Sequence, residues 1–222
     1  MGKGVVKGSP KIGGVWDDLH QLGHRVVKAT ATALESLKEH DLALADRVVR
    51  DDLEINRFRY RAEDAITADL VRAGSVDTVR PLVAGLYVLA DLERMGDHAE
   101  GIAKVALMLG PNPNVAVPGV VLKMGRRVTS MVERTLQALA GRDATAARRI
   151  CEEDDEIDQL YDQAYSELLT AMAGDGRSVP DATYLLWVTH NLERIADRAT
   201  NICERVVYLV TGQVEELNVS KY

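Results

Sequence analysis

The segment NLERIADRATNICER (191–205) carries oxygen-bearing side chains at helical spacing, namely Glu193, Asp197, Asn201 and Glu204. Like charges four residues apart on a helix repel each other by roughly 0.2–0.5 kcal/mol per pair. Carboxylate and amide oxygens are also the ligands that hard and borderline cations prefer in proteins. The spacing therefore predicts either an acidic face that water screens or a surface that binds cations.

A second segment, DLERMGDHAEGIAKV (91–105), repeats this pattern in the first half of the chain, with Gly101 at the position of Asn201. In each half, the preceding helix adds two oxygen-bearing residues spaced four apart. We define the first acidic group by the residues Asp52, Asn56, Glu93 and Asp97. We define the second acidic group by the residues Asp154, Asp158, Glu193 and Asp197, with Asn201 and Glu204 near it.

An alternative interpretation of these carboxylates is a metalloenzyme or a metal-storage bundle. Ferritin-like di-iron sites use inward-pointing Glu residues and Glu-x-x-His pairs on two helices. The chain has no such pair, and His190 precedes Glu193 in the opposite order. A structural zinc–thiolate site is disfavoured because there is no C-x-x-C pair. No nucleophile lies beside a base, so we do not expect an enzyme; a helical scaffold that binds no metal is a third hypothesis.

The composition is that of an ordinary globular protein. Of the 222 residues, 46% are apolar and 27% are charged, and the formal net charge of −7 argues against a general nucleic-acid binder. The two cysteines, Cys151 and Cys203, give no disulfide framework and indicate a reducing compartment. Charges interrupt the apolar stretches well before the roughly 20 residues of a membrane span. Residues 1–14 lack the apolar core of a secretion signal, so we expect a flexible tail and a cytoplasmic protein.

The hydrophobic pattern is helical throughout, and strand patterns are nearly absent. Turn-forming residues divide the chain, most clearly in LGPNPNVAVPG (109–119), which contains three prolines. The pattern predicts an all-α fold of six helices, over about 15–38, 42–72, 77–109, 118–140, 143–173 and 180–211.

The two sides of the proline-rich linker resemble each other. DLEINRFRYRAEDAI (52–66) aligns with DEIDQLYDQAYSELL (155–169) when Ile55 is set on Ile157, an offset of 102 residues. The segments 91–105 and 191–205 align at an offset of 100. A tandem repeat of a three-helix unit explains both offsets. We therefore predict two antiparallel three-helix bundles, spanning 15–112 and 113–222, joined end to end or side by side.

Each main helix carries an apolar seam of the kind that helix bundles bury. In the last helix, the seam comprises Leu192, Ile195, Ala199, Ile202, Val206 and Leu209. At 100° per residue, the acids of this helix lie on nearly the opposite side, and those of the third helix do the same. We therefore expect both acidic groups at the surface rather than inside a bundle core.

The motifs DLERMGDHAEGIA (91–103) and HNLERIADRATNICE (190–204) resemble the PhoU family of phosphate-transport regulators of bacteria and archaea. The resemblance runs from about residue 16 to 212, and its hallmark is the repeated E-x-x-x-D motif, here Glu93–Asp97 and Glu193–Asp197. It implies paired three-helix bundles, no catalysis, and multinuclear clusters of iron or zinc on the acidic surfaces.

The same resemblance implies a cytoplasmic negative regulator of the phosphate-starvation response. Its expected partners are the ATPase subunit of the Pst phosphate transporter and a PhoR-type sensor kinase. Association with the membrane would be peripheral, through those complexes, and we expect a homodimer.

Two departures from the family pattern distinguish the acidic groups. Asn56 stands in place of an acid and removes a charge from the first group. Gly101 replaces the Asn that is common in the first motif, whereas the second motif keeps Asn201. We therefore expect the second group to bind metal better than the first.

Overall fold

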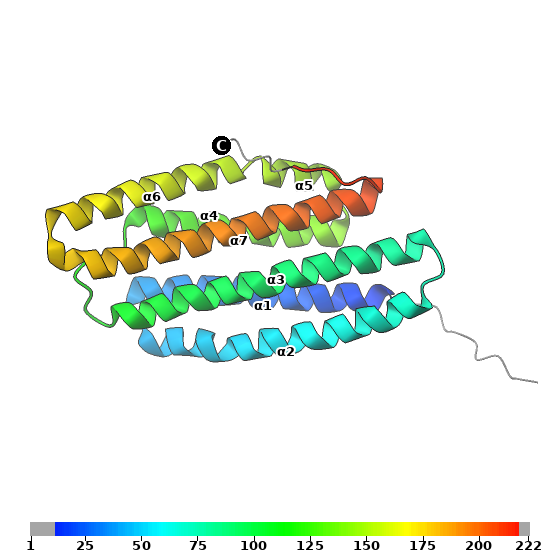
Figure 1. The fold of residues 1–222 in the computed structure, drawn as a ribbon, viewed down its shortest axis with the longest axis horizontal. Helices are drawn as coiled ribbons and strands as arrows, with labels where there is room; N and C mark the ends of the chain where they lie inside the picture. Colours follow the sequence, from blue (N-terminus) through cyan, green and yellow to red (C-terminus); the bar gives the residue numbers. More distant parts are fainter. Residues whose placement is uncertain (1–11, 218–222) are drawn as a thin grey trace, which may run out of the picture.

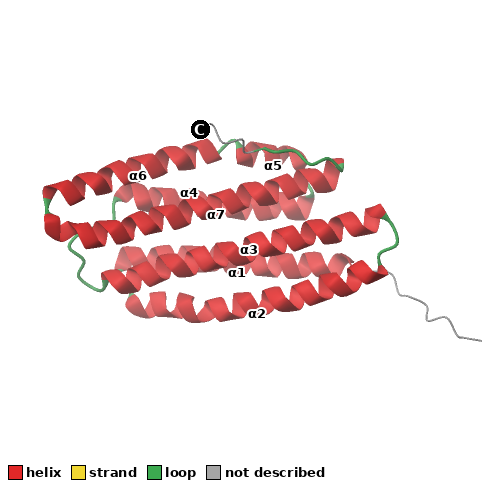
Figure 2. Ribbon diagram, in the orientation of Figure 1, coloured by secondary structure: helices red, strands yellow, loops and turns green. Residues whose placement is uncertain are grey.

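The computed structural model describes residues 12–217 of the chain. These residues form seven α-helices and one short 3-10 helix, and there is no strand among them (Figure 2). The helices are α1 (Ile12–Glu39), α2 (Leu42–Arg72), α3 (Val76–Leu109), α4 (Gly119–Gly141), α5 (Ala144–Cys151), α6 (Asp154–Gly174) and α7 (Val179–Thr211). None of these helices is long and apolar enough to cross a membrane. The predicted tail, 1–14, lies mostly outside the described residues, and α1 begins at Ile12, three residues earlier than expected.

Matching aspartates begin the second helix of each repeat. Asp41 precedes α2, and its carboxylate accepts a hydrogen bond from the backbone N–H of Leu44 at 2.9 Å. Asp143 precedes α5 and accepts one from the N–H of Ala146, also at 2.9 Å. Such caps satisfy N–H groups that have no partner within the helix, and each contributes ~1 kcal/mol. The two aspartates are 102 residues apart, which is the offset that aligns the two repeats in the sequence. The repeat therefore includes the capping residues at which these helices begin.

The fifth predicted helix, 143–173, is interrupted. α5 ends at Cys151 and α6 begins at Asp154, with Glu152 and Glu153 between them. Together α5 and α6 cover residues 144–174, which is the range of α2 displaced by 102 residues. At the break, Glu153 forms an ion pair with Arg134 of α4. The second repeat therefore has two helices where the first has one continuous helix.

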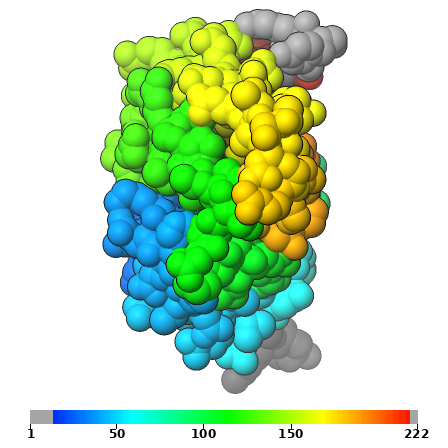
Figure 3. All heavy atoms as spheres, turned by 90° about the vertical axis from the view of Figure 1, so that its left-hand side faces the viewer, coloured from blue at the N-terminus to red at the C-terminus, as the bar shows by residue number. Residues whose placement is uncertain are grey.

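The repeats lie side by side as two three-helix bundles (Figure 1, Figure 3). One bundle contains α1, α2 and α3, and the other contains α4, α7 and the pair α5 and α6. Between the bundles, α3 packs against α7 and α1 packs against α4. In Figure 1, α2, α3, α7 and α6 form the near layer, with α1 and α4 behind it. The all-α tandem repeat predicted from the sequence is confirmed.

The contact between α1 and α4 occurs twice, with the two helices exchanged. Leu136 of α4 packs onto Gly23 of α1, where an added Cβ atom would lie 2.5 Å from a Leu136 methyl carbon. Leu34 of α1 packs onto Gly125 of α4, where the corresponding distance is 2.6 Å. Each glycine, and each leucine, is displaced from its counterpart by the repeat offset. The bundles thus meet about an approximate two-fold axis, as in an isologous dimer, but within one chain.

The apolar seams lie in the core, as predicted. In α7, the seam residues from Leu192 to Val206 are buried, and Leu209 is half-buried. In α3, the corresponding residues from Leu92 to Leu109 are all buried. The two seams belong to a single hydrophobic cluster that includes side chains of both repeats. Because full burial of one such aliphatic side chain contributes roughly 1.5–3 kcal/mol, the seams fix the orientation of α3 and α7 and hence of their acids.

Candidate metal-binding surface

The first acidic group lies on α2 and α3, and the second lies on α6 and α7. In each repeat these two helices pack against each other, which brings the paired motifs together. The helices run in the order α2, α3, α7, α6 across the near layer (Figure 1). The two groups therefore lie on opposite sides of the α3–α7 contact.

Asp52 is buried rather than on the surface, which corrects the sequence-based expectation. Its side chain faces α3 at Gly96, where the absence of a side chain leaves room for a carboxylate; the Cβ position of Gly96 is 3.5 Å from Asp52 Oδ1. Oδ2 accepts a hydrogen bond from Asn56 Nδ2 at 2.7 Å. Oδ1 is buried without a hydrogen-bond partner in the described part of the chain. Burial, together with the charges of Glu100 and Asp97, raises the pKa of Asp52 to about 6.

The α3 side of the first group is more open and contains one acid that the sequence analysis missed. Asp97 is exposed and Glu93 is half-buried, and desolvation raises the pKa of both. Glu100 acts electrostatically on both Asp52 and Asp97, and its own carboxylate pairs with Lys104 at 2.6 Å. Glu93, Asp97 and Glu100 are spaced i, i+4, i+7, a pattern that could have identified Glu100 as a member.

Glu193 is the most strongly perturbed carboxylate of the second group. It is half-buried, and its Oε2 atom is inaccessible and accepts no hydrogen bond within residues 12–217. His190 Nδ1 lies 3.5 Å from this oxygen. The pKa of Glu193 is raised to about 7, mainly because the side chain is buried and secondly because of the charge of Asp197. Asp158 and Asp154 raise this pKa further, so the other three acids of the group all act on Glu193.

Asp154 is also buried, which again corrects the expectation of a surface residue. It is the first residue of α6, directly after the break, whereas its counterpart Asp52 lies in the middle of α2. Carboxylates are favoured in the first turn of a helix because the free N–H groups there carry partial positive charge. Asp158, one turn later, is half-buried. The break thus gives the second group a helix terminus that the first group lacks.

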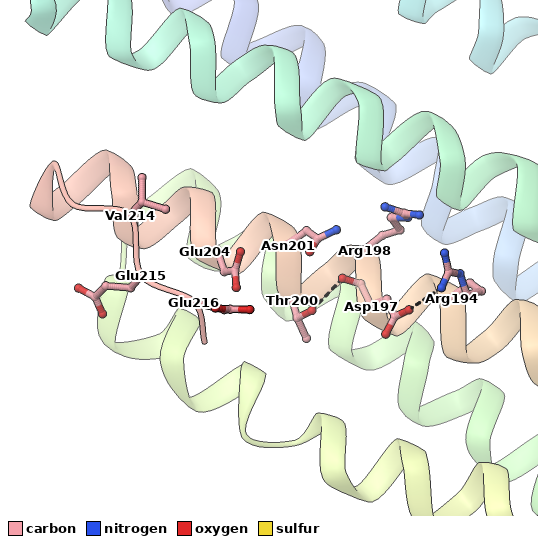
Figure 4. A pocket seen from close by; sticks show the side chains of 9 residues that line it. All are labelled: Arg194, Asp197, Arg198, Thr200, Asn201, Glu204, Val214, Glu215 and Glu216. Carbon is pink, nitrogen blue, oxygen red and sulfur yellow. Dashed lines mark hydrogen bonds and ion pairs between the residues drawn. The ribbon is translucent and has the colours of Figure 1, made fainter. Parts of the chain in front are cut away.

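Asp197 lies between its own acidic group and the cations of α7. Burial raises its pKa, and the positive charges of Arg194 and Arg198 oppose that rise. Arg194 Nη1 lies 3.4 Å from Asp197 Oδ2 (Figure 4). Arg194 therefore forms an ion pair with an acid of its own helix.

Asn201 and Glu204 lie beside Asp197, one of the four acids of the second group, which lines the same pocket as they do (Figure 4). Both line a polar pocket of about 510 Å³ that α7 forms with residues 214–216 (Figure 4). Asn201 Nδ2 donates to Asp91 Oδ1 of α3 at 3.4 Å. Glu204 Oε1 accepts a hydrogen bond from the backbone N–H of Leu217 at 3.0 Å. Their oxygen-bearing side chains therefore hold the neighbouring helix and the C-terminal segment.

The contact of Asn201 has a counterpart in the other repeat. Asp91 of α3 meets Asn201 of α7, and Asn191 of α7 meets Gly101 of α3, whose Cβ position is 3.0 Å from Asn191 Oδ1. Positions 101 and 201 thus contact the partner repeat, and Asn201 also lines a pocket with Asp197 of its own repeat. The difference between Gly101 and Asn201 therefore also changes the α3–α7 contact, and its effect on metal binding stays a prediction.

The two halves of the α3–α7 contact carry different charges. In one half, Arg198 Nη1 lies 3.5 Å from Asp91 Oδ1. In the other half, His98 and Asn191 occupy the equivalent positions, and His98 Nδ1 donates to Asn191 Oδ1 at 2.9 Å because the Asn191 amide nitrogen donates to Trp187. Burial lowers the pKa of His98, which favours the neutral imidazole. An ion pair on one side thus corresponds to a neutral hydrogen bond on the other.

The oxygen donors are of the type that a hard or borderline cation prefers, but they are not arranged around a common point where a cation could bind. Within residues 12–217, no three His, Cys, Asp or Glu side chains lie close enough to hold a metal ion together. Each group nevertheless contains a buried carboxylate oxygen that accepts no hydrogen bond, Asp52 Oδ1 in the first and Glu193 Oε2 in the second. Binding would require rotation of neighbouring acids toward these oxygens, so the iron or zinc cluster stays a prediction.

Comparison with known families matches both repeats. The model of the PhoU domain matches residues 19–106 and 121–206, two ranges whose starts differ by 102 and whose ends differ by 100 residues. The chain is 31% identical over 203 residues to the phosphate-specific transport system accessory protein PhoU homolog of Clostridium acetobutylicum, covering 90% of this chain and 93% of the relative. The Streptococcus pneumoniae protein of the same name is 34% identical over 198 residues, covering 89% and 92%.

Solved structures agree with this match. The crystal structure of the phosphate transport system regulatory protein PhoU from Streptococcus pneumoniae superposes with a TM-score of 0.87 at 32% identity, covering 93% of this chain and 98% of that one. The structure of PhoU from Pseudomonas aeruginosa gives a TM-score of 0.86 at 31% identity, covering 90% and 97%. The likeness thus extends over both bundles and their relative placement.

Proposed function

The chain belongs to the PhoU family, and we propose that it restrains phosphate uptake and phosphate-starvation signalling. Relatives matched over about nine-tenths of this chain are named accessory proteins of the phosphate-specific transport system. The chain is thus a phosphate-transport accessory or regulatory protein by family. Its finer role in our proposal is that of a cytoplasmic adaptor, not an enzyme.

The adaptor would bind the ATPase subunit of the Pst transporter and a PhoR-type histidine kinase. It would reach the membrane only through these complexes, and it would work as a homodimer. The observation that carries the proposal is the pair of acidic groups, one in each repeat, on either side of the α3–α7 contact. Two similar recognition surfaces on one rigid chain suit a protein that links partners, because neither surface needs to close around a substrate.

A metal ion or cluster, iron or zinc, would act on these surfaces by neutralising charge. In the first group, Glu93, Asp97 and Asp52 would hold it, with Asn56 as a neutral donor. In the second group, the four acids would hold it, namely Glu193, Asp197, Asp154 and Asp158, with Asn201 and Glu204 as further donors. Support comes from carboxylates whose pKa values burial and mutual repulsion raise. A cation relieves both effects, because it favours the charged form of each acid. Bound metal would therefore stabilise the acidic surface and change which partners it attracts.

Gene deletion in the source organism tests this role. We expect higher phosphate uptake and higher alkaline phosphatase activity in phosphate-rich medium, restored to the low level by the wild-type gene on a plasmid. Unchanged uptake and phosphatase in the deletion strain would contradict the proposed regulation. Iron-dependent consumption of oxygen by the purified protein, lost in Glu193→Ala, would instead favour the metalloenzyme.

A further inference from the structure

The two cysteines of the chain meet in the core of the second repeat. Cys151 is the last residue of α5 and is 6% exposed, and Cys203 lies on α7 and is fully buried. The two thiols lie close enough to influence each other electrostatically. Cys151 Sγ also lies 3.9 Å from the carbonyl oxygen of Thr200, one turn before Cys203 on α7. Both cysteines are free thiols.

Packing alone does not account for this pair, as the first repeat shows. By the repeat offsets, Val49 is the counterpart of Cys151, and Ala103 is the counterpart of Cys203. Ala103 belongs to the buried hydrophobic core, and Val49 is half-buried and packs against it. Thr135 of α4, whose Oγ1 lies 3.5 Å from Cys203 Sγ, corresponds to the buried Ala33. The same place in the fold is thus filled by apolar side chains in one repeat and by two thiols and a hydroxyl in the other.

The segment that carries Cys151 is short and interrupted. α5 has eight residues and ends where the helix breaks before α6. A helix of this length depends on its packing for stability, and two part-exposed ion pairs, Arg148–Glu215 and Arg134–Glu153, help to hold it. Local opening of such a segment needs less free energy than global unfolding. Opening would uncover the face of Cys203 that α5 covers, and it would let the backbone adjust to an S–S bond of about 2.05 Å.

We propose that Cys151 and Cys203 are a redox-active thiol pair that peroxides oxidise to a reversible intrachain disulfide. One sulfur attacks the O–O bond of hydrogen peroxide, forming a sulfenic acid and releasing one water molecule. The second sulfur then attacks the first, forming the S–S bond as the sulfenic oxygen leaves as a second water molecule. The two thiols lose two electrons and two protons, and one peroxide is reduced to two water molecules. A dithiol reductant reverses the step.

The disulfide would tie α5 covalently to α7. Asp154 follows Cys151 by three residues, so the bond would also fix the start of α6 relative to the helix that carries Glu193. Oxidation would therefore remove the local opening of the break beside the second acidic group. This inference does not depend on the proposed regulatory role, and it applies to the second repeat alone.

The test uses the full chain, reduced and then treated with hydrogen peroxide. We expect the thiols titrated after denaturation to fall from two per chain to none, and dithiothreitol to restore them. Peptide mapping without reductant should link the peptides of Cys151 and Cys203, with a loss of about 2 Da from the intact chain. The oxidised chain should melt about 5–10 °C higher, because the link closes a long loop. Hydrogen exchange should slow across residues 144–153.

Cys151→Ser and Cys203→Ala are the matched controls. Each should keep one thiol, form no intrachain link and show no rise in melting temperature after peroxide. Two outcomes would overturn the proposal in the wild-type chain itself, so neither requires a variant that folds. In the first outcome, both thiols remain after treatment with a peroxide concentration that fully oxidises dithiothreitol. In the second, the cysteines are oxidised only to sulfinic acid or form disulfides only between chains.

Discussion

The two repeats share one backbone plan and differ in the residues around their acids. Both repeats have the caps at Asp41 and Asp143, the mirrored contacts of Gly23 and Gly125, and the same span for α2 and for the α5–α6 pair. The differences lie in the break before Asp154 and in the charges of the α3–α7 contact. Packing that holds the bundles together has thus been kept in both copies, while the electrostatics has changed.

The acidic groups themselves differ by one charge. The first group has three carboxylates and the amide of Asn56, and the second has four carboxylates. Glu100 adds an acid to the first group, but Lys104 pairs with it. The second group therefore has one more carboxylate among its four members, and Arg194 pairs with one of them, Asp197. The additional carboxylate, together with Asn201, is our reason to expect tighter cation binding there.

The largest expected effect tests the part that the repeats share. Gly23→Leu and Gly125→Leu would each force a side chain into the space of a packed leucine between α1 and α4. We expect each to lower the free energy of unfolding by about 2–3 kcal/mol, seen as a fall of roughly 5–10 °C in melting temperature. Gly141→Leu, at an exposed glycine with no neighbouring atom within 4 Å of its Cβ position, is the control. A large loss of stability from only one of these two substitutions would contradict the two-fold relationship between the bundles.

The next effect tests the difference across the α3–α7 contact. Arg198→Ala would leave Asp91, which is 9% exposed, without its cation, and we expect a loss of about 2 kcal/mol in chemical denaturation. His98→Ala would remove a neutral hydrogen bond to Asn191, with an expected loss of about 1 kcal/mol. Equal losses from the two variants would show that the ion pair and the neutral bond contribute alike.

A third prediction concerns pH. The pKa values of Glu193 and Asp52, about 7 and about 6, lie above the ordinary 4.5 and 3.8, so the folded chain binds more protons than the unfolded chain between these limits. Stability is thus lost as pH rises through this range, and the melting temperature should be higher at pH 5.5 than at pH 8.

Amide variants separate the two contributions to this pH dependence. Glu193→Gln should stabilise the metal-free chain at pH 8 by on the order of 1–2 kcal/mol and weaken the dependence near pH 7. Asp52→Asn should act near pH 6 instead. A melting temperature that falls on acidification from pH 8 to pH 5.5 in the wild type would contradict the raised pKa values.

The smallest expected effect is a difference in metal affinity. Titration of the chelator-treated chain with Zn²⁺ in a calorimeter should show a tighter and a weaker class of site. Glu193→Gln should weaken the tighter class by about tenfold, which corresponds to about 1.4 kcal/mol. Glu93→Gln, the same change at the equivalent position, should weaken only the other class. If Glu93→Gln removed the tighter class, the order of the two groups would be reversed.

Much of the fold could be predicted from the hydrophobic periodicity and the turn-forming residues of the sequence. The offset that aligns Ile55 with Ile157 also relates the ends of α2 to the ends of the α5–α6 pair. The burial of Asp52 did not follow, because it depends on the space that Gly96 leaves on a different helix. The partner of Asn201 was missed for a related reason, since one helix's pattern does not say which neighbour packs against its flank. Contacts within a helix were predictable, and contacts between helices required the structure.

The most direct test of the regulatory role compares the two groups in living cells. In the deletion strain, one plasmid would carry the double variant Glu193→Gln and Asp197→Asn, and another would carry Glu93→Gln and Asp97→Asn, with protein levels matched. Alkaline phosphatase would be measured in phosphate-rich medium. We expect the second-repeat variant to leave the phosphatase high and the first-repeat variant to restore repression in part. Full repression by both variants would contradict a regulatory role for the acidic groups.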